Sequence, residues 1–237
     1  MSVKAVLFDL DGTLLPMDQD VFIKTYLKGL AKKLAPCGYE PEKLIKSIWY
    51  CSSAMVENNG KKTNEEVFWD NISAIYGRDV RLDEPLFNEY YCDGFDDAKS
   101  VCSYNAKAAE IVKKVKEYGI STVLATNPVF PRIATEKRAG WAGLDLSDFE
   151  IYTTYENSRF SKPNLKYYED ILTFLGISAD EALMVGNDVG DDMVVKALGM
   201  KVFLLTDCII NKEERDIAEF PHGNFDDLSK YLDSIIK

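Results

Sequence analysis

The chain has 237 residues, 46% of them hydrophobic, enough to bury a core as one large domain or as a domain with an insertion. Its net charge of −11 disfavours nucleic acids and anionic membrane surfaces as partners, because both carry many negative charges. The five cysteines form no C-x-x-C pair, which indicates free thiols rather than a zinc site or a disulfide framework. With no apolar run near the roughly 18 residues of a membrane span, we expect a soluble, cytoplasmic protein.

The first predicted element is a strand over residues 3–10 (VKAVLFDL), an apolar run typical of a strand buried on both faces. The interval 17–103 has no comparable run, and its apolar residues recur at helical spacing over 18–34 and 41–56. A capping-box sequence at 63–66 and Pro85 indicate the starts of two further helices. We expect the aromatic residues of this interval to form a helical-bundle core: Trp49, Trp69, Tyr90 and Tyr91.

After this interval, strands and helices alternate. Strands are predicted over 120–125, 150–154, 182–185 and 202–205, and helices over 105–118, 165–175 and 191–198. Such alternation is typical of an α/β fold with a doubly wound, mostly parallel sheet. We therefore predict an α/β core made of residues 1–16 and 104–237, with residues 17–103 inserted as a helical cap.

Polar residues follow the predicted strands at four places. Asp9 and Asp11, with Gly12, end the first strand, and Thr126 with Asn127 ends the second. Lys162 precedes a helix, and the run 187–192 (NDVGDD) follows the strand 182–185. Because ligands of open α/β sheets bind outside the carboxyl ends of the strands, we expect these side chains to form one site.

The predicted site combines carboxylates with a lysine. Several carboxylates that converge cannot all remain ionised without compensation, and Mg²⁺ supplies it with a few carboxylate oxygens, waters and substrate phosphate oxygens as ligands. Lys162 adds a second positive charge for a phosphoryl group. The parts of a phosphoryl-transfer site are then present: an aspartate nucleophile, an acid, a metal and a cationic clamp.

In this order the four motifs resemble those of the haloacid dehalogenase superfamily, over about residues 3–16 and 105–206. The resemblance implies that Asp9 attacks phosphorus and becomes an aspartyl-phosphate. It implies that Asp11 protonates the leaving group and then activates water, and that Lys162 and Thr126, with Asn127, bind the phosphoryl group. The metal ligands implied are Asp9, Asp11, Asp188 and Asp192.

Two alignments of the last motif are open. Asp188 and Asp192 fit the family's spacing of acids, but a rival alignment puts Asn187 in the place of the first acid. We prefer Asp188, because a carboxylate is the better ligand for a hard cation. Whether Asp191 contributes is also open.

The resemblance implies a magnesium-dependent phosphatase that acts on a small phosphorylated metabolite, as a monomer or homodimer. The insertion lies where this family places a helical cap, which would exclude water and select the leaving group. One alternative is a sugar phosphomutase or a phosphonate hydrolase, the latter requiring a cap lysine that forms an imine. The candidates are Lys24, Lys28, Lys32, Lys33, Lys43, Lys46, Lys61 and Lys62. A more distant alternative is a non-catalytic binding protein on the same fold.

Overall fold

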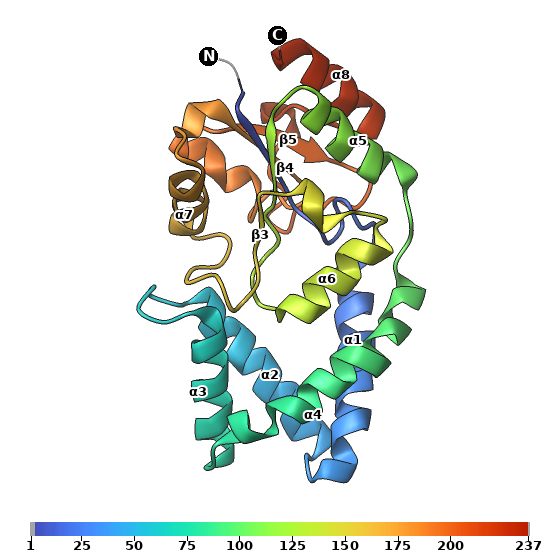
Figure 1. Ribbon diagram of the computed structural model, residues 1–237, viewed down its shortest axis with the longest axis vertical. Coiled ribbons are helices and arrows are strands. Elements are labelled where there is room, and N and C mark those ends of the chain that lie inside the picture. Colours follow the sequence, from blue (N-terminus) through green and yellow to red (C-terminus); the bar gives the residue numbers. More distant parts are fainter. Residues whose placement is uncertain (1–2, 237) are drawn as a thin grey trace.

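A parallel six-stranded sheet forms the centre of the computed structural model, which describes residues 3–236 (Figure 1). In the order β3-β2-β1-β4-β5-β6, the strands are Ile151–Tyr152, Ser121–Leu124, Ala5–Phe8, Ala182–Gly186, Lys201–Leu205 and His222–Gly223. The first strand of the chain, β1, lies in the middle, with Phe8 opposite Leu124 of β2 and Val185 of β4. The predicted doubly wound α/β fold is confirmed, and among the six strands of residues 3–236 the short edge strand β6 is the one that was not predicted.

Helices cover both faces of the sheet. Val6 and Phe8 of β1 belong to a core cluster with α5 (Ala106–Glu117), α6 (Arg132–Trp141) and α8 (Phe225–Ile235). The alternate residues Ala5 and Leu7 pack in a second cluster with α7 (Leu165–Leu175) on the opposite face. Burial on both faces explains why the strands are apolar at nearly every position.

The interval between β1 and α5 is helical. Its main helices are α1 (Gln19–Leu34), α2 (Pro41–Val56), α3 (Asn64–Tyr76) and α4 (Glu84–Glu89), followed by tighter and wider helical turns to Val101. Figure 1 shows them beyond the carboxyl ends of the strands, at the pole opposite both termini. The chain enters and leaves side by side, since the Ser103 amide donates to the Pro16 carbonyl at 2.8 Å. The division into a core and a cap domain at residues 17–103 stays a prediction.

Capping side chains mark the starts of two helices. The Asp18 side chain accepts a hydrogen bond from the Val21 amide at the start of α1, and Thr63 with Glu66 forms the predicted capping box of α3. The predicted helix 191–198 is instead a short 3-10 helix, Met193–Leu198, because the preceding turn is closed by the Asp188 side chain. Helix α6 was not predicted, since its buried side chains include few large apolar ones.

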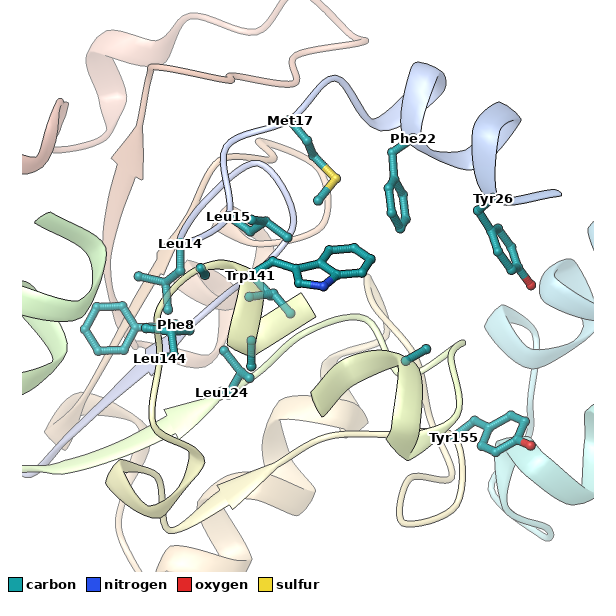
Figure 2. Close-up of a cluster of buried hydrophobic side chains, with 14 of the residues drawn as sticks. Phe8, Leu14, Leu15, Met17, Phe22, Tyr26, Leu124, Trp141, Leu144 and Tyr155 are labelled. Atoms are coloured by element: carbon teal, nitrogen blue, oxygen red, sulfur yellow. The ribbon is translucent and has the colours of Figure 1, made fainter. Parts of the chain in front are cut away.

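One continuous apolar cluster joins the sheet to the cap. Figure 2 shows Trp141 of α6 between the aliphatic residues beside β1 and the Phe22 ring of α1. The same indole stacks on Phe95, with ring centroids 5.1 Å apart. Trp69, Tyr90 and Tyr91 are buried among the helices of residues 17–103 as predicted. The prediction that Trp49 belongs to the same buried core is wrong, because this residue is 50% exposed. None of the helices in residues 3–236 has the length and apolar character needed to cross a membrane.

Candidate active site

A cavity of about 160 Å³ lies at the carboxyl ends of β1, β2 and β4, beneath α1. All the residues predicted for the site line it: Asp9, Asp11, Thr126, Asn127, Lys162, Asp188 and Asp192. The fold therefore brings together residues that are up to 183 positions apart in the chain, as expected for strand ends that meet at one edge. Further lining residues, not predicted, come from α1 and from the segment after β2: Gln19, Phe22, Ile23, Val129 and Phe130.

The Asp9 carboxylate is fixed through both oxygens. Lys162 Nζ donates to Asp9 Oδ1 at 2.8 Å, and the Thr13 hydroxyl lies 2.9 Å from Asp9 Oδ2. Only 6% of Asp9 is exposed. This side chain is a carboxylate held in one orientation at the floor of a cavity, which is what an aspartate nucleophile requires.

Lys162 is a buried cation between two carboxylates. Its Nζ also donates to Asp192 Oδ1 at 2.6 Å, and its side chain is 2% exposed. Burial by itself lowers the pKa of Lys162, but the Asp192 and Asp9 carboxylates outweigh it and raise that pKa well above the usual range. Burial raises the pKa of Asp192 to about 7, against the opposing effect of Lys162. The lysine therefore stays protonated at neutral pH.

Asp192 is anchored by the backbone as well. Its second oxygen, Oδ2, accepts a hydrogen bond from the Asp188 amide at 3.0 Å. The side chain packs directly against Gly186, where an added Cβ would overlap the carboxylate. Both oxygens of Asp192 are thus engaged, and its side chain is 1% exposed.

Asp11 pairs with an arginine that was not predicted. Arg138 of α6 is fully buried, and its Nη1 contacts Asp11 Oδ2 as an ion pair. Burial raises the pKa of Asp11, while Arg138 acts in the opposite direction. Gln19 Nε2 donates to the Asp11 carbonyl at 3.0 Å. A single arginine in a segment without apolar periodicity gave no signal of this role in the sequence.

Asn187 ties the turn after β1 to the loop after β4. Its Oδ1 lies 3.0 Å from the Thr13 hydroxyl, and its Nδ2 donates to the Cys208 carbonyl at 2.7 Å. Gly12 passes beside this amide with φ +82°, and an added Cβ would overlap Asn187 Nδ2. Both ends of the Asn187 side chain are therefore used in holding the two loops together.

Thr126 ends β2 at the cavity wall. Its carbonyl accepts hydrogen bonds from the Thr153 hydroxyl at 2.7 Å and from the Tyr167 hydroxyl at 2.9 Å. The backbone is thus held from two other segments, and Thr126 lines the same cavity as Asp9.

The donor set fits Mg²⁺. Within residues 3–236 no three acidic, histidine or cysteine side chains converge as a ready-made metal cage. Mg²⁺ does not require one, because one or two carboxylates with waters and substrate phosphate oxygens suffice. Asp9 and Asp188 supply carboxylates to the cavity. Two further oxygens of cavity-lining residues, Asp11 Oδ1 and Asn127 Oδ1, are buried and have no hydrogen-bond partner. Such oxygens suit a site completed by a cation, a water or a ligand donor.

The chain is similar to several known proteins over nearly its whole length. It is 27% identical over 207 residues to a candidate pyrophosphatase, PpaX, from Caldanaerobacter subterraneus, covering 85% of this chain and 80% of that one. A HAD phosphatase from Thermococcus onnurineus superposes with a TM-score of 0.59 at 19% identity, covering 99% of this chain and 100% of the other. A predicted phosphoglycolate phosphatase from Haemophilus somnus gives 0.59 at 16% identity, covering 98% and 99%.

A structure of the HAD-hydrolase YfnB from Bacillus subtilis, described as bound to magnesium, gives a TM-score of 0.56 at 17% identity, covering 98% of this chain and 99% of that one. At these identities the structural likeness establishes the fold alone. The family model of haloacid dehalogenase-like hydrolases matches residues 3–199, which is most of the chain and includes every motif of the site. The chain belongs to the haloacid dehalogenase-like hydrolase family.

Proposed function

We propose that this protein is a magnesium-dependent phosphatase that hydrolyses a small phosphomonoester through an aspartyl-phosphate on Asp9. The observation that carries the proposal is the Asp9 carboxylate, held at the cavity floor by the buried Lys162 at 2.8 Å, with Asp11 two residues further on. A fixed carboxylate beside a permanent cation suits attack on an anionic phosphoryl group.

In the first step a carboxylate oxygen of Asp9 forms a bond to phosphorus, and the bond from phosphorus to the alcohol oxygen breaks. The departing oxygen takes a proton from Asp11, so the alcohol leaves neutral. In the second step Asp11 takes a proton from water as the water oxygen attacks phosphorus. Asp9 is released as a carboxylate together with inorganic phosphate.

The remaining residues hold the phosphoryl group. Lys162 would neutralise part of its charge, and the Thr126 hydroxyl and Asn127 amide, which belong to residues lining the same cavity, would donate hydrogen bonds to its oxygens. Mg²⁺, bound by Asp9, Asp188 and the Asp11 carbonyl, would supply further charge neutralisation. We assign Asp188 rather than Asn187 as ligand, because a carboxylate is the better ligand for a hard cation. Asp192 serves here as the buried partner of Lys162.

The phosphonate hydrolase alternative needs a cap lysine at the reaction centre. Lys162, from the core, is the one lysine lining the cavity in the part of the chain that the structure describes. This supports the phosphatase over the imine-forming alternative, in which a cap lysine would reach the substrate.

The test is release of inorganic phosphate from a panel of phosphomonoesters, with pyrophosphate and phosphoglycolate included because the relatives carry these names. Wild type, Asp9→Asn and the control Asp20→Asn, an exposed acid of α1, would be compared with Mg²⁺ and with EDTA. We expect Mg²⁺-dependent release that Asp20→Asn retains and Asp9→Asn loses by on the order of 10⁴-fold or more.

Release that survives Asp9→Asn would contradict the nucleophile, and release that survives EDTA would contradict the metal. No release from any ester by wild type would contradict the phosphatase and favour a mutase or a binding protein.

A further inference from the structure

A second cavity, of about 120 Å³, adjoins the catalytic one on its cap side. Ile23 of α1, with Val129 and Phe130 from the segment after β2, lines both cavities. The other walls come from the cap helices and from the loop after β3, and include Ile48, Trp49, Trp69, Phe87, Tyr91 and Tyr155. In Figure 2, Tyr26 and Tyr155 lie on the cap side of the apolar cluster, away from the strands. We call this space the cap pocket.

The cap pocket presents almost no polar surface. No charged side chain lines it among residues 3–236, and its polar lining side chains other than tryptophan and tyrosine are Ser52 and Asn88. The hydroxyls of Tyr26 and Tyr91 bond to each other at 3.0 Å, so neither depends on a ligand. Trp69 Nε1 is buried on this lining without a hydrogen-bond partner, so a polar group entering the space could replace only part of its hydrogen bonds to water. An apolar group would gain by leaving water.

The size of the cap pocket suits a small apolar group. A cavity of roughly 150 Å³ lined by aliphatic and aromatic side chains is enough to bind benzene. About 120 Å³ therefore accommodates a single ring or a short alkyl chain.

We propose that the substrate is the phosphate ester of an apolar alcohol, whose alkyl or aryl group occupies the cap pocket while its phosphate lies at Asp9. This inference rests on the proposed phosphatase function. The support is that Ile23, Val129 and Phe130 line both cavities, so the apolar cap pocket lies directly beside the catalytic cavity. A phosphorylated sugar or hydroxy acid would fit the catalytic cavity but not the cap pocket.

The first test is kcat/KM for a homologous series of alkyl phosphates from methyl to hexyl. The leaving alcohols differ little in acidity, so the series changes the buried apolar surface while keeping the chemistry nearly constant. We expect kcat/KM to rise about fourfold for each CH2 group that enters the pocket, and then to level off once it is full. Glycerol phosphate and phosphoglycolate should rank with methyl phosphate.

The second test fills the cap pocket. Ser52 of α2 lines it, whereas the next residue, Ser53, is exposed and does not. Ser52→Phe should lower the ratio of kcat/KM for hexyl over methyl phosphate at least about tenfold, and the matched Ser53→Phe should leave that ratio within about twofold of wild type. The series on wild type needs no variant, so it decides the proposal even where Ser52→Phe does not fold.

The third test measures binding without turnover. Calorimetric titration of the Asp9→Asn variant with hexyl and methyl phosphate should show tighter binding of hexyl phosphate, by at least about tenfold. Phosphate release from the whole series with equal kcat/KM, or equal affinities in the titration, would overturn the cap-pocket proposal and leave the phosphatase standing. No release from any ester, with hexyl phosphate still bound more tightly, would overturn the phosphatase and leave the pocket as an apolar binding site.

Discussion

The catalytic cavity and the cap pocket have Ile23, Val129 and Phe130 in common, and they differ in the chemistry of their other lining residues. In the catalytic cavity the acidic and basic side chains are held by partners from different elements: Lys162 lies between Asp9 and Asp192, and Asp11 meets Arg138. In the cap pocket the surface is mainly aromatic and aliphatic, and it is formed by helices together with the segments after β2 and β3. The proposed phosphoryl-transfer residues lie at strand ends, and the apolar pocket proposed to bind the leaving group lies between those strand ends and the helices of residues 17–103. Four experiments test the assignments in the catalytic cavity.

The largest effect is expected from removing the central cation of the catalytic cavity. Lys162→Met leaves the carboxylates of Asp9 and Asp192 buried without their cation, so the free energy of unfolding should fall by about 3–5 kcal/mol. The control is Lys166→Met, an exposed lysine of α7 that faces a phenylalanine ring. Urea unfolding followed by circular dichroism measures both.

The stability loss in Lys162→Met should shrink as the pH falls from about 9 to about 6. Lys162 lowers the pKa of Asp192, which is about 7 with the lysine present, so its removal raises that pKa further. The folded variant therefore takes up a proton on Asp192 at a pH where wild type still holds the ion pair, and the difference disappears once wild-type Asp192 is protonated too. An equal loss at both pH values, or a loss no larger than that of Lys166→Met, would contradict the assigned role.

The next effect concerns Arg138 as a positioning residue for Asp11. Arg138→Met should lower kcat/KM by about 100-fold, because Asp11 loses the ion pair that orients it. Arg138 also lowers the pKa of Asp11, so its removal raises that pKa and keeps the acid form to higher pH. The alkaline limb of the pH profile of kcat/KM should therefore move to higher pH.

Two further variants test this assignment. Arg138→Lys should return the alkaline limb toward its wild-type position, and Arg132→Met, an exposed arginine of the same helix, should leave the profile unchanged. An alkaline limb that stays in place in Arg138→Met would mean that the arginine is structural only.

A smaller effect is expected at the turn that carries Asp11. Gly12→Ala forces a left-handed φ of +82° on a residue with a Cβ and pushes that atom into Asn187. We expect it to lower the free energy of unfolding by about 2 kcal/mol or more. Gly199→Ala has a matching φ of +89° with nothing within 4 Å, so it should cost only about 1 kcal/mol. Equal losses in the two variants would show that the contact with Asn187 is unimportant.

The smallest effect distinguishes the metal ligands. Asp188→Asn should weaken Mg²⁺ binding, measured by calorimetry, by at least about tenfold, because a charged ligand is removed. The control Asp191→Asn changes a neighbouring acid of the same cavity and should weaken binding by less than about threefold. Unchanged affinity in Asp188→Asn would favour the alignment that gives the ligand position to Asn187.

Local patterns in the sequence were sufficient for much of the fold. The apolar runs predicted five of the six strands, and the residues directly after them, such as Asp9 and Thr126, predicted the lining of the cavity. The capping box at 63–66 predicted the start of α3. These predictions succeed because strand burial, side-chain alternation and capping are decided within a few residues of the chain.

Other features had no local signal. Arg138 follows Asp11 by 127 positions and meets it only because α6 packs under the end of β1. Trp49 has the same helical spacing as its buried neighbours, yet it is half exposed and borders the cap pocket. Periodicity shows that a helix face is buried without showing against what it packs.

The α/β sheet, the residues at its strand ends and the family can be recognised from the sequence, because each depends on short patterns in order along the chain. The folded structure is needed to see that Lys162 pairs with both Asp9 and Asp192, that Arg138 contacts Asp11, and that Phe130 borders both a charged cavity and an apolar one. Those contacts join segments that are distant in the chain, and their energies depend on burial, which exists only after the helices and the sheet have packed together.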